Sequence, residues 1–524
     1  MKEEGGGERR ELPLVGRARA HGDRTAIRAT EGSFTYDDLM SASEAVARAL
    51  LGERDDLGED RVAFLVPPDF QYAAVQWGIW RAGGIAVPMA VSHPPRELAY
   101  VLEDADPVAV VAHPSLMERL GEARGLPVLS SAALVGGAAG GRFGASPEGS
   151  ALRVLPDVDS SRRAMMLYTS GTTGRPKGVV TTHANVEAQV RSLVEAWAWT
   201  PEDHILLTLP LHHVHGIVNV LTSALWSGAH CTILPNFQEA AVWNEIARDD
   251  LTLYMAVPTI YAKLLAAWEL APPERRQAWS EGCRSLRLMV SGSAALPVSM
   301  LERWREVSGH TLLERYGMTE IGMALSNPLE GERRPGFVGR PLPGVDVRLV
   351  GEDGRPVDDG EPGEIEVRGP TVFSEYWRRP DETEASFHDG WFSTGDMAVL
   401  EDGAYRILGR SSVDIIKTGG FKVSALEVEE VLRTHPSVAD CAVVAVPDPE
   451  WGERVAVALV LAAGVSEPPG GTELRAWMKE QLAPYKVPSL FMTLPELPRN
   501  AMGKVTKPAV QELFAEDGAG VDPE

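Results

Sequence analysis

The stretch "YTSGTTGRPKG" (168–178) decides the fold class, because it places a glycine-rich loop between two ordered segments. The residues "AMMLY" (164–168) indicate a buried strand, and "VVTTHANV" (179–186) leads into a helical pattern. Glycines let a backbone approach an anion closely, and successive N–H groups in tight turns form a concave anion site. A strand, a glycine loop and a return to regular structure are typical of phosphate-binding loops. The stretch therefore predicts an α/β protein with a phosphate site, and a solvated surface turn is the alternative interpretation.

The spacing within this stretch excludes one kind of phosphate site, the P-loop. A P-loop needs two glycines separated by four residues, followed by Lys and then Ser or Thr. Counting from Gly171, the second glycine would fall at Pro176, and Lys177 is followed by Gly178. The stretch still offers hydroxyl groups, glycine amides and one positive charge for a phosphate. These candidates are Thr169, Ser170, Gly171, Thr172, Thr173, Gly174 and Lys177.

Length, charge and cysteine content limit the class of protein. The chain has 524 residues, too many for one compact core, so we expect two or more domains. A formal net charge of −24 would repel nucleic acid and anionic membrane surfaces. Three scattered cysteines fit buried thiols in a reducing compartment, and early acidic residues in "MKEEGGGERRELP" (1–13) do not support a mitochondrial address. We expect a cytoplasmic enzyme, monomeric or homodimeric, without nucleic-acid or membrane partners.

Apolar strands alternate with helical patterns as far as about residue 335. Examples are the strands "RVAFLV" (61–66) and "LTLYMAVP" (251–258), and a helix followed by a strand in "QYAAVQWGIWRAGGIAVPM" (71–89). Strands that alternate with helices predict largely parallel sheets with helices on their faces. The first fold-class prediction is therefore a large N-terminal α/β domain.

The pattern of apolar segments and turn residues changes after about residue 335. Short segments split by Gly, Pro and Asp, such as "GEIEVRG" (363–369), predict an antiparallel β subdomain that closes the first region, with "STGD" (393–396) in a turn between strands. Beyond residue 411, a helix near 425–434 and strands at 440–448 and 454–462 predict a small α+β unit. We therefore divide the chain into domains 1–410 and 411–524.

Five further stretches combine glycine, hydroxyl and acidic residues at sheet edges. They are "SGSAALP" (291–297), "ERYGMTE" (314–320), "STGD" (393–396), "GRSSVDIIKTGGFKV" (409–423) and "PRNAMGKVTK" (498–507). In this order the chain resembles the adenylate-forming superfamily of acyl-CoA synthetases, luciferases and peptide-synthetase adenylation domains, over roughly residues 20–512. The resemblance implies that a substrate carboxylate attacks the α-phosphate of ATP, that pyrophosphate leaves an acyl-AMP, and that the thiol of coenzyme A then displaces AMP.

The resemblance also implies roles for individual residues. Thr319 would hydrogen-bond the α-phosphate, Glu320 and Thr172 would hold Mg²⁺, and the loop would cradle the departing phosphates. Lys504 would be the catalytic lysine of adenylation, and Asp396 would accept the ribose hydroxyls. The other implied nucleotide contacts are Gly292, Ser293, Ala294, Arg315, Tyr316 stacked on adenine, Gly317, Met318 and Arg410. Taken alone, Thr319–Glu320 would be interpreted as a helix cap, and Lys504 as a solvated loop lysine.

Members of this superfamily rotate the C-terminal domain between the two half-reactions. The resemblance therefore implies that residues 411–524 are a mobile domain with its hinge within Ser411–Asp414. After the rotation, Gly419, Gly420, Phe421 and Lys422 would line the tunnel for the pantetheine arm of coenzyme A. Glycines there would leave room for a narrow thiol chain.

The acid should bind beside "LPLHHVHGIVN" (209–219), "AVPTIY" (256–261) and "SGSAALP". The implied acyl-substrate residues are His213, Arg315, Ser291 and Met318. His213, which is also an implied catalytic residue, matches the His or aromatic position that gates the active site in this family. No aspartate occurs in 209–219, which argues against an amino-acid substrate. A guanidinium at the floor of the pocket suits a second carboxylate, which it can grip with two hydrogen bonds. "HHVHG", "LERYGMTE" and "RRPGFVGRPLPGV" resemble the malonyl-CoA synthetase branch, so malonate or methylmalonate is expected; alternatively, Arg315 only forms a salt bridge with Glu314 or another surface acid.

Three other functions stay open at this point. The chain could activate a short or medium monocarboxylate, or it could be a standalone adenylating enzyme that loads a carrier protein. A catalytically inactive binding protein on this fold would require loss of the chemistry residues, yet Thr319, Glu320, Asp396 and Lys504 are all present.

Overall fold

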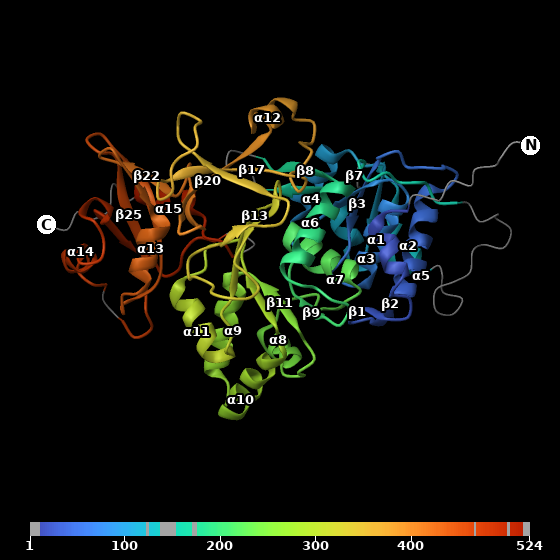
Figure 1. Cartoon of the computed structure of the whole chain (residues 1–524), viewed down its shortest axis with the longest axis horizontal. Coiled ribbons are helices and arrows are strands. Elements are labelled where there is room, and N and C mark those ends of the chain that lie inside the picture. Colours follow the sequence, from blue (N-terminus) through green and yellow to red (C-terminus); the bar gives the residue numbers. More distant parts are fainter. Residues whose placement is uncertain are drawn as a thin grey trace, which may run out of the picture.

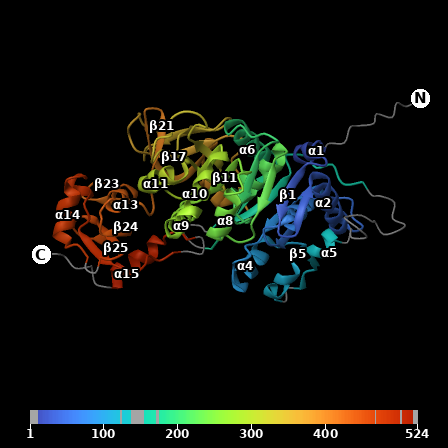
Figure 2. The ribbon, with the colours of Figure 1, turned by 90° about the horizontal axis from the view of Figure 1, so that it is seen from below.

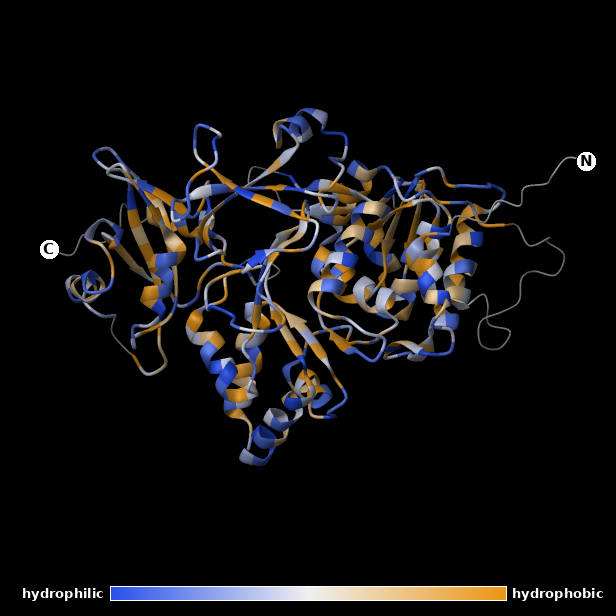
Figure 3. Cartoon of the chain, viewed as in Figure 1, coloured by the Kyte–Doolittle hydropathy of each residue, from blue (hydrophilic) through white to orange (hydrophobic). Residues whose placement is uncertain are grey.

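The computed structural model of the chain describes residues 11–121, 125–136, 154–169, 175–465, 468–499 and 503–516. It shows sheets flanked by helices, and the residues after Arg410 form a separate lobe at one end of the molecule in both ribbon views (Figures 1 and 2). The predicted α/β class is confirmed. Apolar residues concentrate in the strands and on the inner helix faces (Figure 3). None of the helices within these residues is long and apolar enough to cross a membrane.

The first large sheet has the described strand order β18-β8-β7-β4-β3-β5-β6, and its neighbours from β7 to β6 are parallel. Val62 and Phe64 of β3 face the cluster built on α2 and α3, whereas Ala63 and Leu65 face α4. A strand buried on both faces in this way explains the unbroken apolar run at 62–66. The strands are β3 (Arg61–Leu65), β4 (Ile85–Pro88), β5 (Ala109–Ala112), β6 (Val128–Ser130), β7 (Arg163–Thr169), β8 (Lys177–Thr182) and β18 (Glu375–Tyr376).

The second large sheet has the described order β15-β14-β13-β12-β11-β9-β10-β1-β2 and is parallel from β13 to β1. It is also covered on both faces, because Leu253 and Met255 of β11 face one cluster and Tyr254 and Ala256 the other. Its strands are β1 (Thr25–Ala29), β2 (Gly32–Thr35), β9 (His204–Leu207), β10 (His230–Ile233), β11 (Leu253–Ala256), β12 (Leu288–Ser291), β13 (Leu313–Met318), β14 (Gly322–Ser326) and β15 (Arg340–Pro341).

The helices of this region begin where their sequences supply caps. Thr35 and Asp38 form a capping box at the start of α2, and Thr182 and Asn185 form one at the start of α6. The helices are α1 (Pro13–Arg19), α2 (Tyr36–Leu51), α3 (Phe70–Arg81), α4 (Pro95–Ala105), α5 (Ser131–Gly136), α6 (His183–Ala196), α7 (Ser223–Ser227), α8 (Glu239–Ile246), α9 (Pro258–Leu270), α10 (Pro273–Gly282) and α11 (Val298–Ser308). Shorter turns are η1 (Pro114–Leu120) and η4 (Cys283–Ser285), and η3 (His215–Thr222) is a π-helix.

The antiparallel subdomain follows, as predicted. It consists of β16 (Asp346–Val350), β17 (Gly363–Arg368), β19 (Phe387–His388), β20 (Trp391–Glu401) and β21 (Ala404–Arg410), with α12 (Pro380–Ala385) beside it. The prediction of a turn at 393–396 is wrong, because these residues lie inside β20. Gly395 has φ of 73°, and the pairing register shifts between Met397 and Ala398, so the strand continues through an irregularity instead of ending.

The C-terminal lobe is an α+β unit built on one small sheet. Its strands are β22 (Ile415–Thr418), β23 (Phe421–Ser424), β24 (Val438–Asp448), β25 (Gly452–Leu461) and β26 (Leu490–Thr493). Helices α13 (Ala425–Arg433) and α14 (Gly471–Lys479) cover one face, α15 (Lys507–Glu516) covers the other, and η5 (Pro484–Lys486) is a short turn. The proposed boundary between residues 410 and 411 falls in the connection from β21 to β22.

Candidate active site

The residues predicted to bind the nucleotide come from β13 and from the consecutive strands β20 and β21, which follow it by more than 70 residues. The hydroxyl of Tyr316 in β13 donates to Oδ2 of Asp396 in β20 at 2.6 Å, and Nε of Arg410 in β21 lies 3.1 Å from Oδ1. Burial raises the pKa of Asp396, whereas the charge of Arg410 and the hydrogen bond from Tyr316 lower it. The structure thus brings these three candidates together around one buried carboxylate. Stacking of Tyr316 on adenine stays a prediction.

Two glycines make close packing around β13 possible. A Cβ on Gly317 would lie 2.1 Å from the carbonyl oxygen of Gly322, and a Cβ on Gly292 would lie 2.5 Å from Cζ of Arg315. Ser293, the next residue, has φ of 69°, which is uncommon for a side chain other than glycine. Of the remaining candidates here, Ala294 is exposed, and Met318 at the end of β13 is half-buried against the main core.

The predicted phosphate loop connects two antiparallel strands. Thr169 of β7 pairs with Lys177 of β8 at the end of the hairpin next to this loop. The other loop candidates, Ser170, Gly171, Thr172, Thr173 and Gly174, lie outside the described residues. Lys177 forms an ion pair with Oε2 of Glu382, and its ammonium lies 5.0 Å from the ring centroid of Tyr376.

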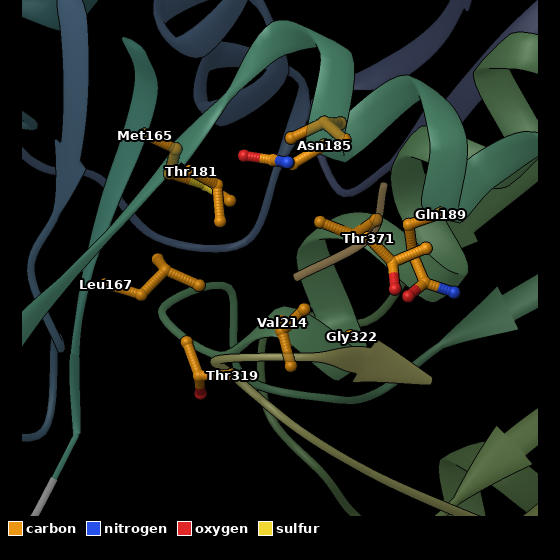
Figure 4. Close-up of a pocket in the computed structure, with 11 residues that line it drawn as sticks. Met165, Leu167, Thr181, Asn185, Gln189, Val214, Thr319, Gly322 and Thr371 are labelled. Carbon is orange, nitrogen blue, oxygen red and sulfur yellow. The ribbon is translucent and has the colours of Figure 1, made fainter. Parts of the chain in front are cut away.

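Thr319 lines a small pocket that residues of β7 and β8 also line. Its side chain lines a pocket with Leu167 of β7, Thr181 of β8 and Val214, and Gln189 of α6 and Thr371 line the other end (Figure 4). The α-phosphate candidate therefore adjoins the strands that carry the phosphate loop.

Glu320 is the carboxylate available for a metal ion. It is buried, and its Oε1 accepts a hydrogen bond from the hydroxyl of Tyr376 at 3.1 Å. Burial raises the pKa of Glu320, and the charges of Arg410 and Lys177 lower it. The described residues contain no group of three or more metal-ligating side chains. A single carboxylate fits Mg²⁺, because this ion is commonly held by one or two carboxylates together with substrate phosphates.

Arg315 is the most unusual residue of the site. It is 3% exposed, and its Nη2 donates to Oγ of Ser293 at 3.3 Å, but its Nε and Nη1 have no hydrogen-bond partner in the described structure. Burial lowers the pKa of Arg315 to about 9, which leaves it charged at neutral pH. The alternative salt bridge with Glu314 or another acid is not formed among the described residues, because the guanidinium contacts only Ser293, and Oε1 of Glu314 accepts from the backbone N–H of Gly336 at 3.0 Å.

The surroundings of Arg315 are polar and poorly satisfied. Nε2 of His215, on which the charge of Arg315 acts, and Oγ of Ser291, next to the Gly292 that packs on Arg315, are buried without a partner among the described residues. The same holds for Nε2 of His213 and the side-chain amide of Asn219 in the segment that contains His215. Buried polar groups are normally hydrogen-bonded, so a group of orphaned atoms beside a charged side chain indicates a polar ligand. Burial, together with the charge of Lys504, lowers the pKa of His213 to about 4.

His215 was missed from the sequence. Its Nδ1 lies 3.4 Å from Oγ of Ser293, the same oxygen that Arg315 contacts. Burial holds its pKa well below the ordinary value, as do the charges of Arg315 and Lys504. His215 begins the π-helix η3, and π-helical turns are frequent at functional sites. The run "HHVHG" contained the signal, but spacing alone could not say which imidazole meets Ser293.

Lys504 lies with the N-terminal residues in this orientation of the C-terminal lobe. Arg315, Arg410 and Asp396 all act electrostatically on its ammonium. Although the residue is exposed overall, the protein around its ammonium lowers the pKa of Lys504, Arg315 and Arg410 lower it further, and Asp396 raises it. The lobe is held by a hydrogen bond from the backbone N–H of Val298 to Oε1 of Glu430 at 2.8 Å.

The coenzyme A candidates have other contacts in this orientation. Gly419 and Gly420 form the turn between β22 and β23, and Phe421 is exposed and stacks on Tyr485 with centroids 4.2 Å apart. Nζ of Lys422 lies 2.8 Å from Oε1 of Glu352 in the β subdomain. These contacts do not place the four residues with Lys504, so their predicted role requires a second orientation.

Comparisons with known proteins now decide the family. Residues 14–377 match the family model described as AMP-binding enzyme, and residues 427–504 match the AMP-binding enzyme C-terminal domain. The chain belongs to the AMP-binding enzyme family. The resemblance to adenylate-forming enzymes is thereby confirmed.

Relatives cover nearly the whole chain. The mitochondrial malonate–CoA ligase ACSF3 of Xenopus laevis is 46% identical over 95% of this chain and 91% of that protein. The ATP-bound crystal structure of MatB from Rhodopseudomonas palustris is 34% identical, with a TM-score of 0.86 over 97% of this chain and 99% of that one. A malonyl-CoA ligase ternary product complex with methylmalonyl-CoA and AMP is 38% identical, with a TM-score of 0.66 over 93% of this chain and 100% of that one.

Proposed function

We propose that this chain is an ATP-dependent acid–CoA ligase acting on malonate or methylmalonate. One carboxylate of the acid attacks the α-phosphate of ATP, pyrophosphate leaves, and an acyl-adenylate forms. The thiol of coenzyme A then attacks the acyl carbonyl carbon, and AMP leaves as the thioester forms. The relatives that support this assignment are named malonate–CoA ligases.

The observation that carries the dicarboxylate assignment is the buried guanidinium of Arg315. Its Nε and Nη1 point to no partner in the described structure, and an unpaired buried charge is costly. A second carboxylate of the acid would accept hydrogen bonds from this group and offset its charge. A monocarboxylate with an apolar end would leave the charge unpaired.

The site residues take the following roles in this proposal. Lys504 stabilises the charge that develops on the attacking carboxylate and the phosphorus, and Thr319 donates to the α-phosphate. Asp396, held by Tyr316 and Arg410, receives the ribose hydroxyls. Glu320 holds Mg²⁺, which neutralises charge on the triphosphate when bound.

Rotation of the domain 411–524 about Ser411–Asp414 would separate the two steps. The structure aligns with the ATP-bound relative at a TM-score of 0.86 and with the product complex at 0.66. This difference, and the position of Lys504, support an adenylation orientation here. In the second orientation Gly419, Gly420, Phe421 and Lys422 would line the pantetheine tunnel. The vertebrate relatives are named as mitochondrial proteins, so a cytoplasmic location stays a prediction.

An acid-by-acid screen of coenzyme A-dependent AMP formation tests the proposal. We expect malonate or methylmalonate to give the highest kcat/KM and butyrate to be poor. Efficient turnover of butyrate would favour a monocarboxylate ligase, and pyrophosphate release without thioester formation on free coenzyme A would favour a carrier-loading enzyme. ATP binding without turnover of any acid would favour an inactive binding protein.

A further inference from the structure

Tyr376 lies between β8, the strand that follows the predicted phosphate loop, and Glu320, the carboxylate assigned to the metal ion. It pairs with Val179 of β8, two residues beyond Lys177. On either side of Tyr376, the N–H of Ser374 donates to the carbonyl of Val180 at 2.9 Å and that of Trp377 to the carbonyl of Gly178 at 2.8 Å. The backbone of Tyr376 is therefore fixed to the strand that leaves the phosphate loop.

The hydroxyl of Tyr376 fixes the other partner, Glu320. It donates to Oε1 of Glu320 at 3.1 Å, and both side chains are buried. A second bond ties the same two segments, because the N–H of Phe373 donates to the carbonyl of Glu320 at 2.7 Å. The hydrogen bond to Oε1 restricts the orientation of the carboxylate, which would then offer Oε2 to a metal ion. Hydrogen bonds of this kind commonly set the geometry and affinity of metal ligands.

The aromatic ring of Tyr376 contacts a positively charged group, the ammonium of Lys177. The ammonium of Lys177 lies 5.0 Å from its centroid, within the range of a cation–π interaction. Lys177 is also paired with Glu382, whose side chain is 44% exposed. The side chain of Tyr376 thus contacts both Glu320, which is assigned to the metal ion, and Lys177, which is assigned to the departing phosphates.

We propose that Tyr376 is a positioning residue that orients Glu320 for Mg²⁺ and connects Glu320 to β8, the strand that follows the predicted phosphate loop. Metal and phosphate groups would then be gripped by parts of the protein that move together. The proposal deepens the function proposed above, on whose ATP and Mg²⁺ chemistry it rests, but it does not depend on the identity of the acid.

The test uses Tyr376→Phe, which removes only the hydroxyl, and Tyr405→Phe as the matched control. Tyr405 is buried like Tyr376 but lies in the β subdomain, and its hydroxyl donates to the carbonyl of Val347 at 3.3 Å. Titration calorimetry without any acid measures the Kd of ATP with Mg²⁺ and with EDTA. The Kd measured with EDTA divided by the Kd measured with Mg²⁺ reports how much the metal strengthens nucleotide binding.

We expect Tyr376→Phe to reduce this ratio by about tenfold, since loss of a partner behind a metal ligand commonly costs 10–100-fold in affinity. The Kd with EDTA and the melting temperature should change little, and Tyr405→Phe should leave the ratio unchanged. In a Glu320→Gln background, Tyr376→Phe should have no further effect, because the carboxylate that it positions is gone. In turnover assays the Mg²⁺ concentration for half-maximal rate should rise, with the KM of the acid unchanged.

An unchanged ratio in Tyr376→Phe, or an additive loss in the double variant, would overturn the proposal and leave Tyr376 as a packing residue beside Phe373. Failure of the malonate assignment would give a different result. In that case the acid screen would fail while the Mg²⁺ ratio in the wild-type protein and its loss in Tyr376→Phe would persist.

Discussion

Replacing Arg315 with methionine tests the substrate assignment most directly. Methionine keeps much of the length of the side chain and removes the charge. The lost contact within the protein is small, because the guanidinium makes only the 3.3 Å hydrogen bond to Ser293 among the described residues. Since an unpaired buried charge is unfavourable, we expect the melting temperature of the ligand-free variant to stay the same or rise.

The loss should appear when malonate binds. Removing one partner of a buried charge pair costs roughly 3–5 kcal/mol, which is about two to three and a half decades in kcat/KM. Butyrate has a methyl group where malonate has its second carboxylate. The variant should therefore retain its activity on butyrate or improve it, because the methyl end no longer meets a charge.

Kinetics of AMP formation on both acids, with the Kd of ATP as a check of the nucleotide site, provide the measurement. Arg333→Met is a matched control, because Nη1 and Nη2 of Arg333 donate to the carbonyls of Thr311 and Leu329. It should lower stability without changing the preference between acids. Equal losses on malonate and butyrate in Arg315→Met, with ATP binding intact, would refute the reasoning and return Arg315 to a structural role.

Four further outcomes follow from the site. Lys504→Ala should cripple adenylation yet largely spare thioester formation from supplied acyl-AMP, and equal losses in the two half-reactions would count against domain rotation. Ser412→Pro should mainly slow the thioester step in single-turnover assays, whereas two unaffected steps would place the hinge elsewhere. Glu382→Gln should tighten pyrophosphate binding by about two- to fivefold, because the carboxylate competes for the nearby lysine in a partly exposed pair; weaker binding would contradict this. Burial raises the pKa of Glu314 to about 8, so the folded state keeps a proton that the unfolded chain loses above about pH 4.5, and stability falls as the pH rises between these values. Glu314→Gln should flatten that fall in melting temperature between pH 5 and 8, and an unchanged slope would show that other groups cause it.

Local patterns were sufficient for much of the fold. Strands such as 61–66 and 251–258 are short apolar runs, and a strand buried on both faces leaves that mark wherever it lies. The turn predicted at 393–396 failed because Gly395 permits an irregularity within β20 as readily as a reversal of the chain. A glycine signals backbone freedom, but only the neighbouring strands decide how that freedom is used.

The sequence by itself determined the family, and it supplied the predictions of a phosphate loop and of most candidate residues, because those residues lie in short motifs whose spacing is visible along the chain. Only the tertiary structure decided which side chains meet. Glu314 and Arg315 are adjacent in sequence but have different partners, since successive residues of a strand point to opposite faces. His215 meets Ser293 across 78 residues, and Tyr376 meets Glu320 across 56. Such contacts depend on how separate strands, helices and loops pack together, and no local pattern of residues records them.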